Sequence, residues 1–423
     1  MGTRLLSTLA PYRRALESSA VRRLMVGYGA SALGNGAGSV AVAWLATELA
    51  PLSQRPYAVG FSLAAYLLPG AVVGLTAGRW AHRFDPRLLV ALDGGLRLAG
   101  LSAIGILQLL GRLDLAGYVA LLAVSSLFLT FGSGGVISLV GAHVDAESRF
   151  AANSFVQALG QVSLTVIGPG IGGVLVALLG APVVVILDAA TYAVLLVAVA
   201  MVPSAAGADS QEQRSAARGL GLRGLIARPT VAWLLALTFV FYGFYGPVET
   251  AIPILIRHDL RAGPGLLGGF WAAFGVGALI GGLAAGTRTI TNLRRFAVAI
   301  VAGWGLALLL VAATDQLVVI LVAIAVGGII YAPYPAASTT LLQKEFSGPD
   351  LTSGAVAWSG VANGVVPIGM LIGGPAVSVW GARSTMAASA IATIALAILV
   401  TALIPEGRGL PWRHRRPAQD RLS

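Results

Sequence analysis

The chain has 423 residues, of which 57% are hydrophobic and only 11% are charged. Water-soluble domains usually carry about 25% charged residues, so this composition excludes a soluble domain and indicates a protein embedded in lipid. The absence of cysteine excludes disulfides, thiolate metal sites and iron–sulfur clusters. The net charge of +11 does not indicate nucleic-acid binding, because basic residues of membrane proteins concentrate in cytoplasmic loops.

The chain begins with an arginine-rich segment, residues 1–23, that lacks the apolar core of a cleavable signal peptide. We expect it to form a cytoplasmic arm on the membrane surface. A transmembrane helix needs about 20 mainly apolar residues, and twelve later segments qualify. Their predicted bounds are 24–49, 57–80, 88–110, 115–141, 152–179, 182–202, 231–256, 264–287, 293–313, 317–341, 352–380 and 383–404.

A long polar connection divides these segments into two halves of six. The predicted domains are an N-terminal bundle (24–202), a cytoplasmic linker (203–230), a C-terminal bundle (231–404) and a basic cytoplasmic tail (405–423). Of the 28 basic residues, 22 lie on the side of both termini and the linker, five lie on the other side, and Arg97 lies inside a span. The positive-inside rule therefore predicts a multi-pass protein of the cell membrane with both termini in the cytoplasm.

The two halves repeat each other in sequence. The stretch "GAVVGLTAG" at the end of the second segment matches "GALIGGLAAG" at the end of the eighth. The glycine pair of the fifth segment, Gly172 and Gly173, is in register with Gly373 and Gly374 of the eleventh. Parallel six-helix repeats are typical of secondary transporters, which bind substrate at the midplane between the halves. The predicted fold is thus an all-α membrane protein of twelve helices in two pseudo-symmetric bundles.

Three motifs resemble those of the major facilitator superfamily. The loop "GRWAHRFDPR" resembles its cytoplasmic gating loop at Gly78, Arg83 and Arg87, whereas His82, Asp85 and Pro86 depart from the pattern. The exporter motif Gly-Pro-x-x-Gly-Gly is matched by Gly168, Pro169, Gly172 and Gly173. The stretches "RFAANSF" and "GPVETAIP" resemble the branch that holds enterobactin exporters, macrolide efflux proteins and actinobacterial multidrug pumps.

This resemblance implies a secondary transporter that exports drugs, antibiotics or siderophore-like metabolites by alternating access, with protons as the coupling ion. One departure is Phe128, which stands in the fourth segment where related antiporters often carry an arginine. A proton route through that arginine is therefore absent. An importer or facilitator of a small nutrient is the alternative, and a receptor or intramembrane enzyme is a more remote one.

Charged residues inside membrane spans are costly and mark functional sites. The proton-coupling candidates are Glu249, Asp188, Asp93 and Arg97. Asp93 and Arg97 are four residues apart and can form an ion pair on one helix face. Glu249 lies between Pro247 and Pro253, which we expect to break the seventh span. Because its carboxyl group lacks water and a nearby cation, desolvation favours the protonated form and suits it to proton exchange or to binding a cationic substrate, with a structural hydrogen bond as the alternative.

Polar and aromatic residues of the spans supply candidates for the substrate pocket, because aromatic faces suit large apolar or cationic substrates. These candidates are Asn35, Gln157, Gln161, Tyr242, Tyr245, Trp271, Tyr331, Tyr334 and Asn363. We expect a small-molecule substrate, protons and membrane lipid as partners, and a monomer.

Other chemistry is not indicated. The four histidines lack zinc-type spacing, and no Gly-x-Ser-x-Gly motif is present. A phosphate-binding loop ends in Gly-Lys-Ser/Thr, but the single lysine, Lys344, follows Gln343. We therefore expect no metal, cofactor, nucleotide or nucleic acid, no enzymatic activity, and a proton gradient as the energy source.

Overall fold

The computed structural model describes residues 17–77, 84–203, 222–286 and 290–404. Within these ranges the chain is helical and has no strand. The first half contains α2 (Ser19–Leu49), η1 (Leu52–Gln54), α3 (Arg55–Ala77), α4 (Pro86–Leu109), α5 (Leu115–Ser125), α6 (Leu129–Ala142), α7 (Ala146–Val162), η3 (Ser163–Ile167), α8 (Gly168–Leu179) and α9 (Ala181–Ala200). The second half contains α11 (Leu222–Ile226), α12 (Pro229–Ile254), η4 (Leu255–Asp259), α13 (Pro264–Gly286), α14 (Leu293–Ala312), α15 (Leu317–Tyr331), α16 (Pro333–Glu345) and α17 (Gly348–Leu403).

Several helices begin at polar caps that satisfy free backbone N–H groups. Ser18 accepts from the Val21 amide at the start of α2, and Asp114 accepts from the Gly117 amide at the start of α5. Asn292 caps α14 in the same way. Among the described residues, ten helical stretches are long and apolar enough to cross a membrane.

The number of membrane crossings is twelve, because α17 contains two and α2 adds one to the ten stretches. The stretch Ser353–Leu403 contains two passes, because α17 breaks at Gly381, whose φ of 78° reverses the chain. The glycine-rich α2 is less apolar but is buried along most of its length and forms the remaining crossing. The prediction of an all-α protein with twelve membrane helices in two bundles is confirmed.

The fourth, fifth and seventh spans depart from regular α-helix. The fourth is divided into α5 and α6, and the fifth contains the π-helical turn η3. In the seventh, α12 continues through Pro247 and Pro253 to Ile254, so the expected break is wrong. The irregularity follows the prolines as the π-helical turn η4, since neighbouring helices and local π adjustments can satisfy the backbone groups that a proline frees.

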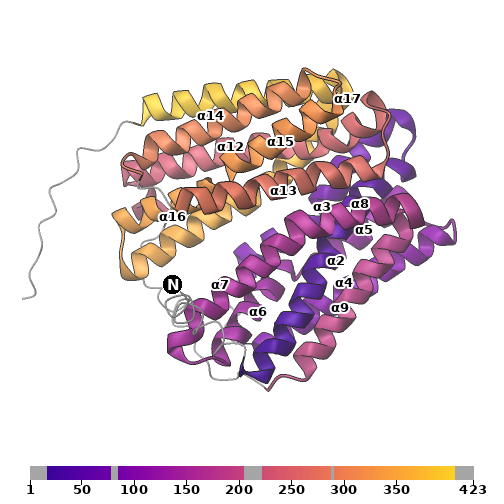
Figure 1. The fold of residues 1–423 in the computed structure, drawn as a ribbon, viewed down its shortest axis with the longest axis horizontal. Helices are drawn as coiled ribbons and strands as arrows, with labels where there is room; N and C mark the ends of the chain where they lie inside the picture. The colour runs from indigo at the N-terminus through magenta and orange to yellow at the C-terminus, as the bar shows by residue number, and fades with distance from the viewer. Residues whose placement is uncertain (1–16, 78–83, 204–221, 287–289, 405–423) are drawn as a thin grey trace, which may run out of the picture.

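The two bundles form a V (Figure 1). We call the face where α2 begins and α17 ends the terminal face, and the face that carries Gly180 and Gly381 the opposite face. The bundles meet at the opposite face and diverge towards the terminal face. Glycine 180 has φ 83° and turns the chain between α8 and α9, as Gly381 does within α17.

Glycines create the close contacts within and between the bundles. A Cβ atom on Gly172 would lie 2.5 Å from the Cα of Ala37 in α2, and one on Gly373 would lie 2.8 Å from the Cα of Pro247 in α12. Their neighbours face the other bundle: a Cβ on Gly173 would lie 2.8 Å from the Cα of Gly268, and one on Gly374 would lie 3.1 Å from the Cα of Tyr57. Small residues allow membrane helices to approach closely, so each glycine pair joins one contact within a bundle to one between bundles.

Candidate functional site

A cavity of about 820 Å³ lies between the two bundles and is lined by residues from both. Ligand pockets usually have volumes of about 300–1,000 Å³, so the cavity suits a drug-sized molecule. Its lining includes Ser133 of α6 and Val356 of α17, and α6 lies on the side where the bundles diverge in Figure 1. The glycine contacts around Gly173 and Gly374 close its other end.

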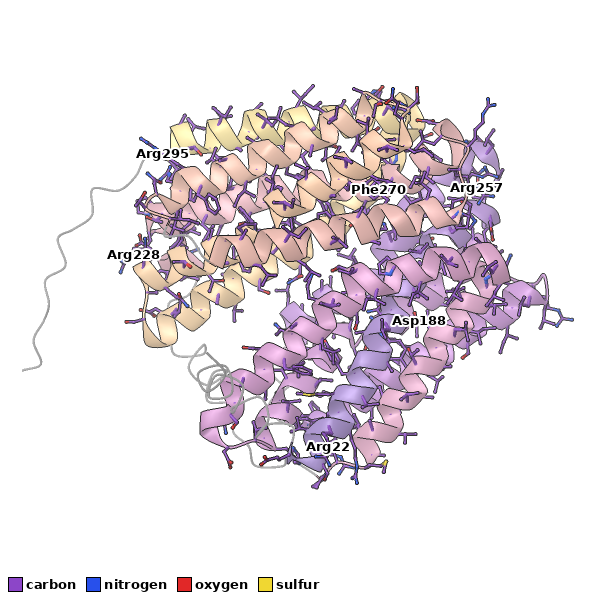
Figure 2. The ribbon with its side chains drawn as sticks, viewed as in Figure 1. Arg22, Asp188, Arg228, Arg257, Phe270 and Arg295 are labelled. Atoms are coloured by element: carbon purple, nitrogen blue, oxygen red, sulfur yellow. The ribbon has the colours of Figure 1, made fainter. Side chains whose placement is uncertain are left out.

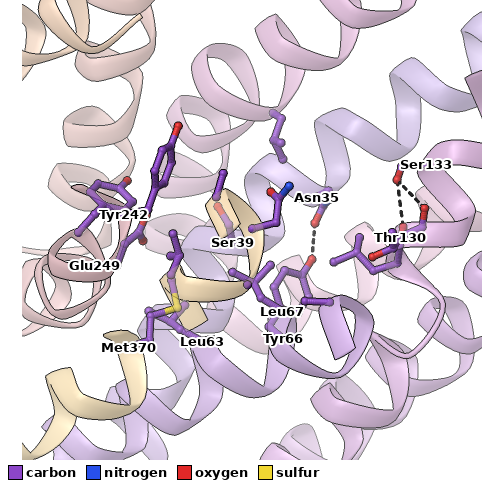
Figure 3. A pocket seen from close by; sticks show the side chains of 18 of the residues that line it. Asn35, Ser39, Leu63, Tyr66, Leu67, Thr130, Ser133, Tyr242, Glu249 and Met370 are labelled. Carbon is purple, nitrogen blue, oxygen red and sulfur yellow. Dashed lines mark hydrogen bonds between the residues drawn. The ribbon is translucent and has the colours of Figure 1, made fainter. Parts of the chain in front are cut away.

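Glu249 supplies the carboxyl group on the second bundle's side of the cavity (Figure 3). Its side chain lies beside the hydroxyl group of Tyr245, one helical turn earlier on α12. Tyr242, one turn earlier again, also lines the cavity. No arginine, lysine or histidine from this bundle appears among the cavity-lining residues that the structure describes.

Aromatic rings form a connected wall around Glu249. Trp271 and Phe274 of α13 line the cavity, with ring centroids 6.1 Å apart in an edge-to-face arrangement. Behind them, Tyr331 contacts Phe274 at 5.5 Å and donates a hydrogen bond to the Tyr242 hydroxyl at 2.9 Å. Packing of this kind holds the rings in fixed positions, because each ring has few ways to move without disturbing its neighbours.

The first bundle contributes a buried polar cluster around Arg97. Its guanidinium pairs with Asp93 at 3.2 Å and donates to the hydroxyl groups of Tyr66 at 3.1 Å and Tyr192 at 3.0 Å. Tyr66 in turn donates to Asn35 (Figure 3). Arg97, Tyr66 and Asn35 all reach the cavity lining. The ion pair of Asp93 and Arg97 was predicted, but the hydrogen bonds of Arg97 with Tyr66 and Tyr192 were not.

Asp188 lies behind this cluster, on α9, away from the cavity lining (Figure 2). Both of its carboxylate oxygens are buried, and neither has a hydrogen-bond partner in the described part of the chain. It packs against α2, where a Cβ on Gly38 would lie 2.1 Å from its Oδ2 atom. Arg97 is the charged residue that acts on it electrostatically.

The structure brings together five of the nine predicted pocket residues. Asn35, Tyr242, Tyr245, Trp271 and Asn363 line the cavity. Tyr331 and Tyr334 lie behind Tyr242, and the Tyr334 hydroxyl is 2.9 Å from that of Thr238. Gln157 is exposed on α7 outside the cavity lining. Gln161 reaches the site indirectly, because its amide lies 3.3 Å from the hydroxyl of Thr165, which lines the cavity.

The gating-loop candidates lie only partly within the described residues. Gly78, His82 and Arg83 fall outside them. Asp85 caps α4 by accepting a hydrogen bond from the Arg87 amide at 2.8 Å. The Arg87 guanidinium donates to the carbonyl of Ala200, 3.3 Å away at the end of α9.

The exporter-motif residues divide between two contacts: Gly168 and Gly172 face α2 of their own bundle, and Gly173 faces α13 of the other. Pro169 lines the cavity, and Gly168 follows the π-helical turn η3, whose Ser163 and Leu164 carbonyls approach Gly36 of α2. A π-helical turn inside a membrane helix often accompanies a functional site.

Sequence reasoning missed several cavity residues. Small hydroxyl residues line the first bundle's side, namely Ser39, Thr130, Ser133 and Thr165. Thr130 and Ser133 are three residues apart, which places both on one helix face. That spacing could have predicted a polar helix face towards the cavity. No sequence pattern around Tyr66 or Met370 indicates that they line it.

Comparison with known proteins agrees with this architecture. The profile of the Major Facilitator Superfamily matches residues 24–289, which is more than half of the chain. The chain is 25% identical over 393 residues to the Multidrug efflux pump Tap of Mycolicibacterium fortuitum, covering 89% of this chain and 93% of that protein. It is 26% identical over 247 residues to an uncharacterized MFS-type transporter of Sinorhizobium fredii, covering 57% and 60%.

Solved structures share the fold at low sequence identity. The nucleoside transporter NupG matches with a TM-score of 0.67 and 14% identity, covering 91% of this chain and 99% of that one. A bacterial homologue of the iron transporter ferroportin, solved in an inward-facing state, matches with a TM-score of 0.66 and 14% identity, covering 90% and 98%.

Proposed function

Since the chain belongs to the major facilitator superfamily, a family of multi-pass membrane transporters and not of enzymes, we propose that it exports amphiphilic small molecules in exchange for protons. The observation that carries the proposal is the cavity between the bundles, where the Glu249 carboxyl group stands among aromatic rings. The multidrug efflux function of the relatives from Mycolicibacterium and Mycobacterium supports export of drug-like molecules.

In this proposal the terminal face is cytoplasmic, as the distribution of basic residues indicates. The arrangement in Figure 1 is then the state that loads substrate from the cytoplasm. Amphiphilic molecules lie against the aromatic wall of Trp271 and Phe274 while their polar groups face Glu249 and Asn363. The protein acts as a monomer, because both bundles of one chain complete the cavity.

The transport cycle follows from the two states of the Glu249 carboxyl group. A proton from outside neutralises it when the cavity faces outward, and substrate leaves. In the cytoplasm-facing state the proton departs, and the carboxylate again favours a substrate that carries a positive or hydrogen-bond-donating group. A charge crossing 100 mV supplies about 2.3 kcal/mol and one pH unit about 1.4 kcal/mol, so one proton exchanged for one uncharged substrate sustains a roughly 10²–10³-fold gradient. For a monovalent cation the two charges cancel, and the pH gradient alone sustains about tenfold per pH unit.

The change Glu249→Gln tests this role, because glutamine keeps the shape of the side chain but cannot exchange a proton. In inside-out vesicles from an efflux-deficient host, we expect the variant to lose accumulation of the aromatic cation ethidium driven by a pH gradient. Glutamine resembles the protonated carboxyl group, so we expect it to weaken binding of the ethidium cation. Exchange of labelled for unlabelled ethidium, which needs no net proton movement, should therefore persist at saturating ethidium.

The matched control is Glu345→Gln, the same change at the end of α16 and outside the cavity lining. It should leave both reactions unchanged. Undiminished pH-driven accumulation by Glu249→Gln would remove Glu249 from the proton route. A loss of exchange even at saturating ethidium would show that the variant fails to bind ethidium or to fold, and would contradict a role confined to proton coupling.

A further inference from the structure

The π-helical turn η4 carries two basic residues, Arg257 and His258, at the opposite face of the molecule. Figure 2 shows Arg257 at the end of the molecule where the two bundles meet. Neither residue belongs to the cavity lining. Both side chains are half-buried, and both make their polar contacts with the first bundle rather than with their own.

Arg257 binds the end of α2 in two ways. Its guanidinium donates a hydrogen bond to the hydroxyl of Thr47 and lies 4.8 Å from the centroid of the Trp44 ring. Thr47 can accept this bond because its own proton is donated to the Trp44 carbonyl at 2.6 Å. Thr47 is fully buried and Trp44 nearly so, so the arginine docks on a rigid surface.

His258 binds the start of α3. Its Nε2 atom lies 3.1 Å from the Nη1 atom of Arg55. The Nε–H group of the same arginine donates a hydrogen bond to the Ala50 carbonyl. A guanidinium can only donate hydrogen bonds, so the Nε2 atom must be the acceptor and must carry no proton. The contact therefore requires a neutral imidazole.

The surrounding charges decide what protonation of His258 would do. Arg55 of α3 and Arg257 of η4 face the imidazole, while Asp259 is the nearby acid. Asp259 is itself engaged by Arg383 of α17 at 3.6 Å, and Arg383 also pairs with Asp315. Glu48 of α2 acts on Arg257. A proton on His258 would remove the Arg55 hydrogen bond and place a third positive charge beside two arginines.

We propose that these five residues, Trp44, Thr47, Arg55, Arg257 and His258, form a latch that holds the opposite face closed and that protonation of His258 releases. The proposal rests on the proposed alternation of the cavity between the two faces. Because the opposite face is the external one in that scheme, acid outside would favour opening on the side from which protons enter.

The experiment measures the opening directly and needs no substrate. The chain has no cysteine, so spin labels can be placed at Leu52→Cys and Gln316→Cys, exposed sites of different bundles near the opposite face. Distances between the labels are measured by electron paramagnetic resonance in lipid nanodiscs at about pH 7.5 and about pH 5.5, on either side of the usual histidine titration. We expect acid to raise the ratio of open to closed molecules by about tenfold.

Two variants separate the parts of the latch. His258→Gln should stay closed at both pH values, because its amide oxygen can accept from Arg55 but does not titrate. Arg257→Gln should populate the open distance even at neutral pH, whereas Arg261→Gln, the same change four residues later, should behave like the parent.

If the distances in the parent do not change with pH, or if His258→Gln responds to pH as the parent does, then protonation of His258 does not release the latch. If the distances between the spin labels are the same in Arg257→Gln and Arg261→Gln, then the contacts of Arg257 do not hold the opposite face closed. These results are independent of the Glu249 test, since they require neither ethidium transport nor a proton gradient. Elution of each variant as a single symmetric peak establishes that it is folded.

Discussion

Single residues show how differently two buried carboxylates of the same bundle are held. Asp93 is paired directly with Arg97, which also binds Tyr66 and Tyr192. Asp188 is equally buried, but its oxygens have no hydrogen-bond partner among the described residues. In the sequence, Asp93 has an arginine one helical turn later, Arg97, whereas Asp188 is a lone charged residue in an apolar segment. Their surroundings pair Asp93 with Arg97 and leave the oxygens of Asp188 without such a partner.

The pair of changes Asp93→Asn and Asp188→Asn tests this distinction. We expect Asp93→Asn to lower the free energy of unfolding by about 3–5 kcal/mol, because removing one partner of a buried ion pair leaves the other uncompensated. Asp188→Asn should cost clearly less. Thermal unfolding of the purified variants in detergent measures both, and an equal or larger loss for Asp188→Asn would contradict the assignment.

At the scale of helices, the exporter motif works through the faces of α8. Gly172 faces α2 of its own bundle and Gly173 faces α13 of the other, so adjacent residues serve folding and closure separately. Gly170 belongs to the same motif region, yet a Cβ there would meet only the Cβ of Ala272 at 3.4 Å. Close packing therefore requires glycine at positions 172 and 173 of α8 but not at position 170.

The changes Gly172→Ala and Gly170→Ala form a matched pair within one helix. The first would bring a methyl group against the α2 backbone, and overpacking of this kind costs typically about 1–3 kcal/mol. The second should be neutral or slightly stabilising, because alanine favours helix more than glycine does. Thermal stability and yield of monodisperse protein measure the difference. Equal tolerance of both changes would show that α2 and α8 are packed less closely than described.

At the scale of the whole molecule, the two bundles are closed at one face and divergent at the other. The closed face is held by the glycine contacts of α8 with α13 and α17 with α3, and by the contacts of Arg257 and His258. These contacts join one bundle to the other and leave the core of each bundle intact, which is compatible with the proposed exchange of one open end for the other.

Cysteine labelling tests both the direction of the opening and the proposed orientation. Ser133→Cys places a thiol in the cavity, where the serine is exposed. A membrane-impermeant maleimide should label it in inside-out vesicles and far less in intact cells. Gln316→Cys, on the opposite face, should show the reverse pattern. The same preference for both sites would contradict the arrangement.

The sequence by itself determined the twelve helices, the two repeated halves and the family, because membrane spans are specified by local apolar length and the motifs are contiguous. It also marked Glu249 and the aromatic residues near it. The tertiary structure decided which of those aromatics reach the cavity, since Tyr331 and Tyr334 differ from Tyr242 only in their neighbours. It likewise revealed the contacts of Arg257 with Thr47 and of His258 with Arg55, residues about 200 positions apart. No local pattern encodes such pairs, because only the packing of one bundle on the other brings them together.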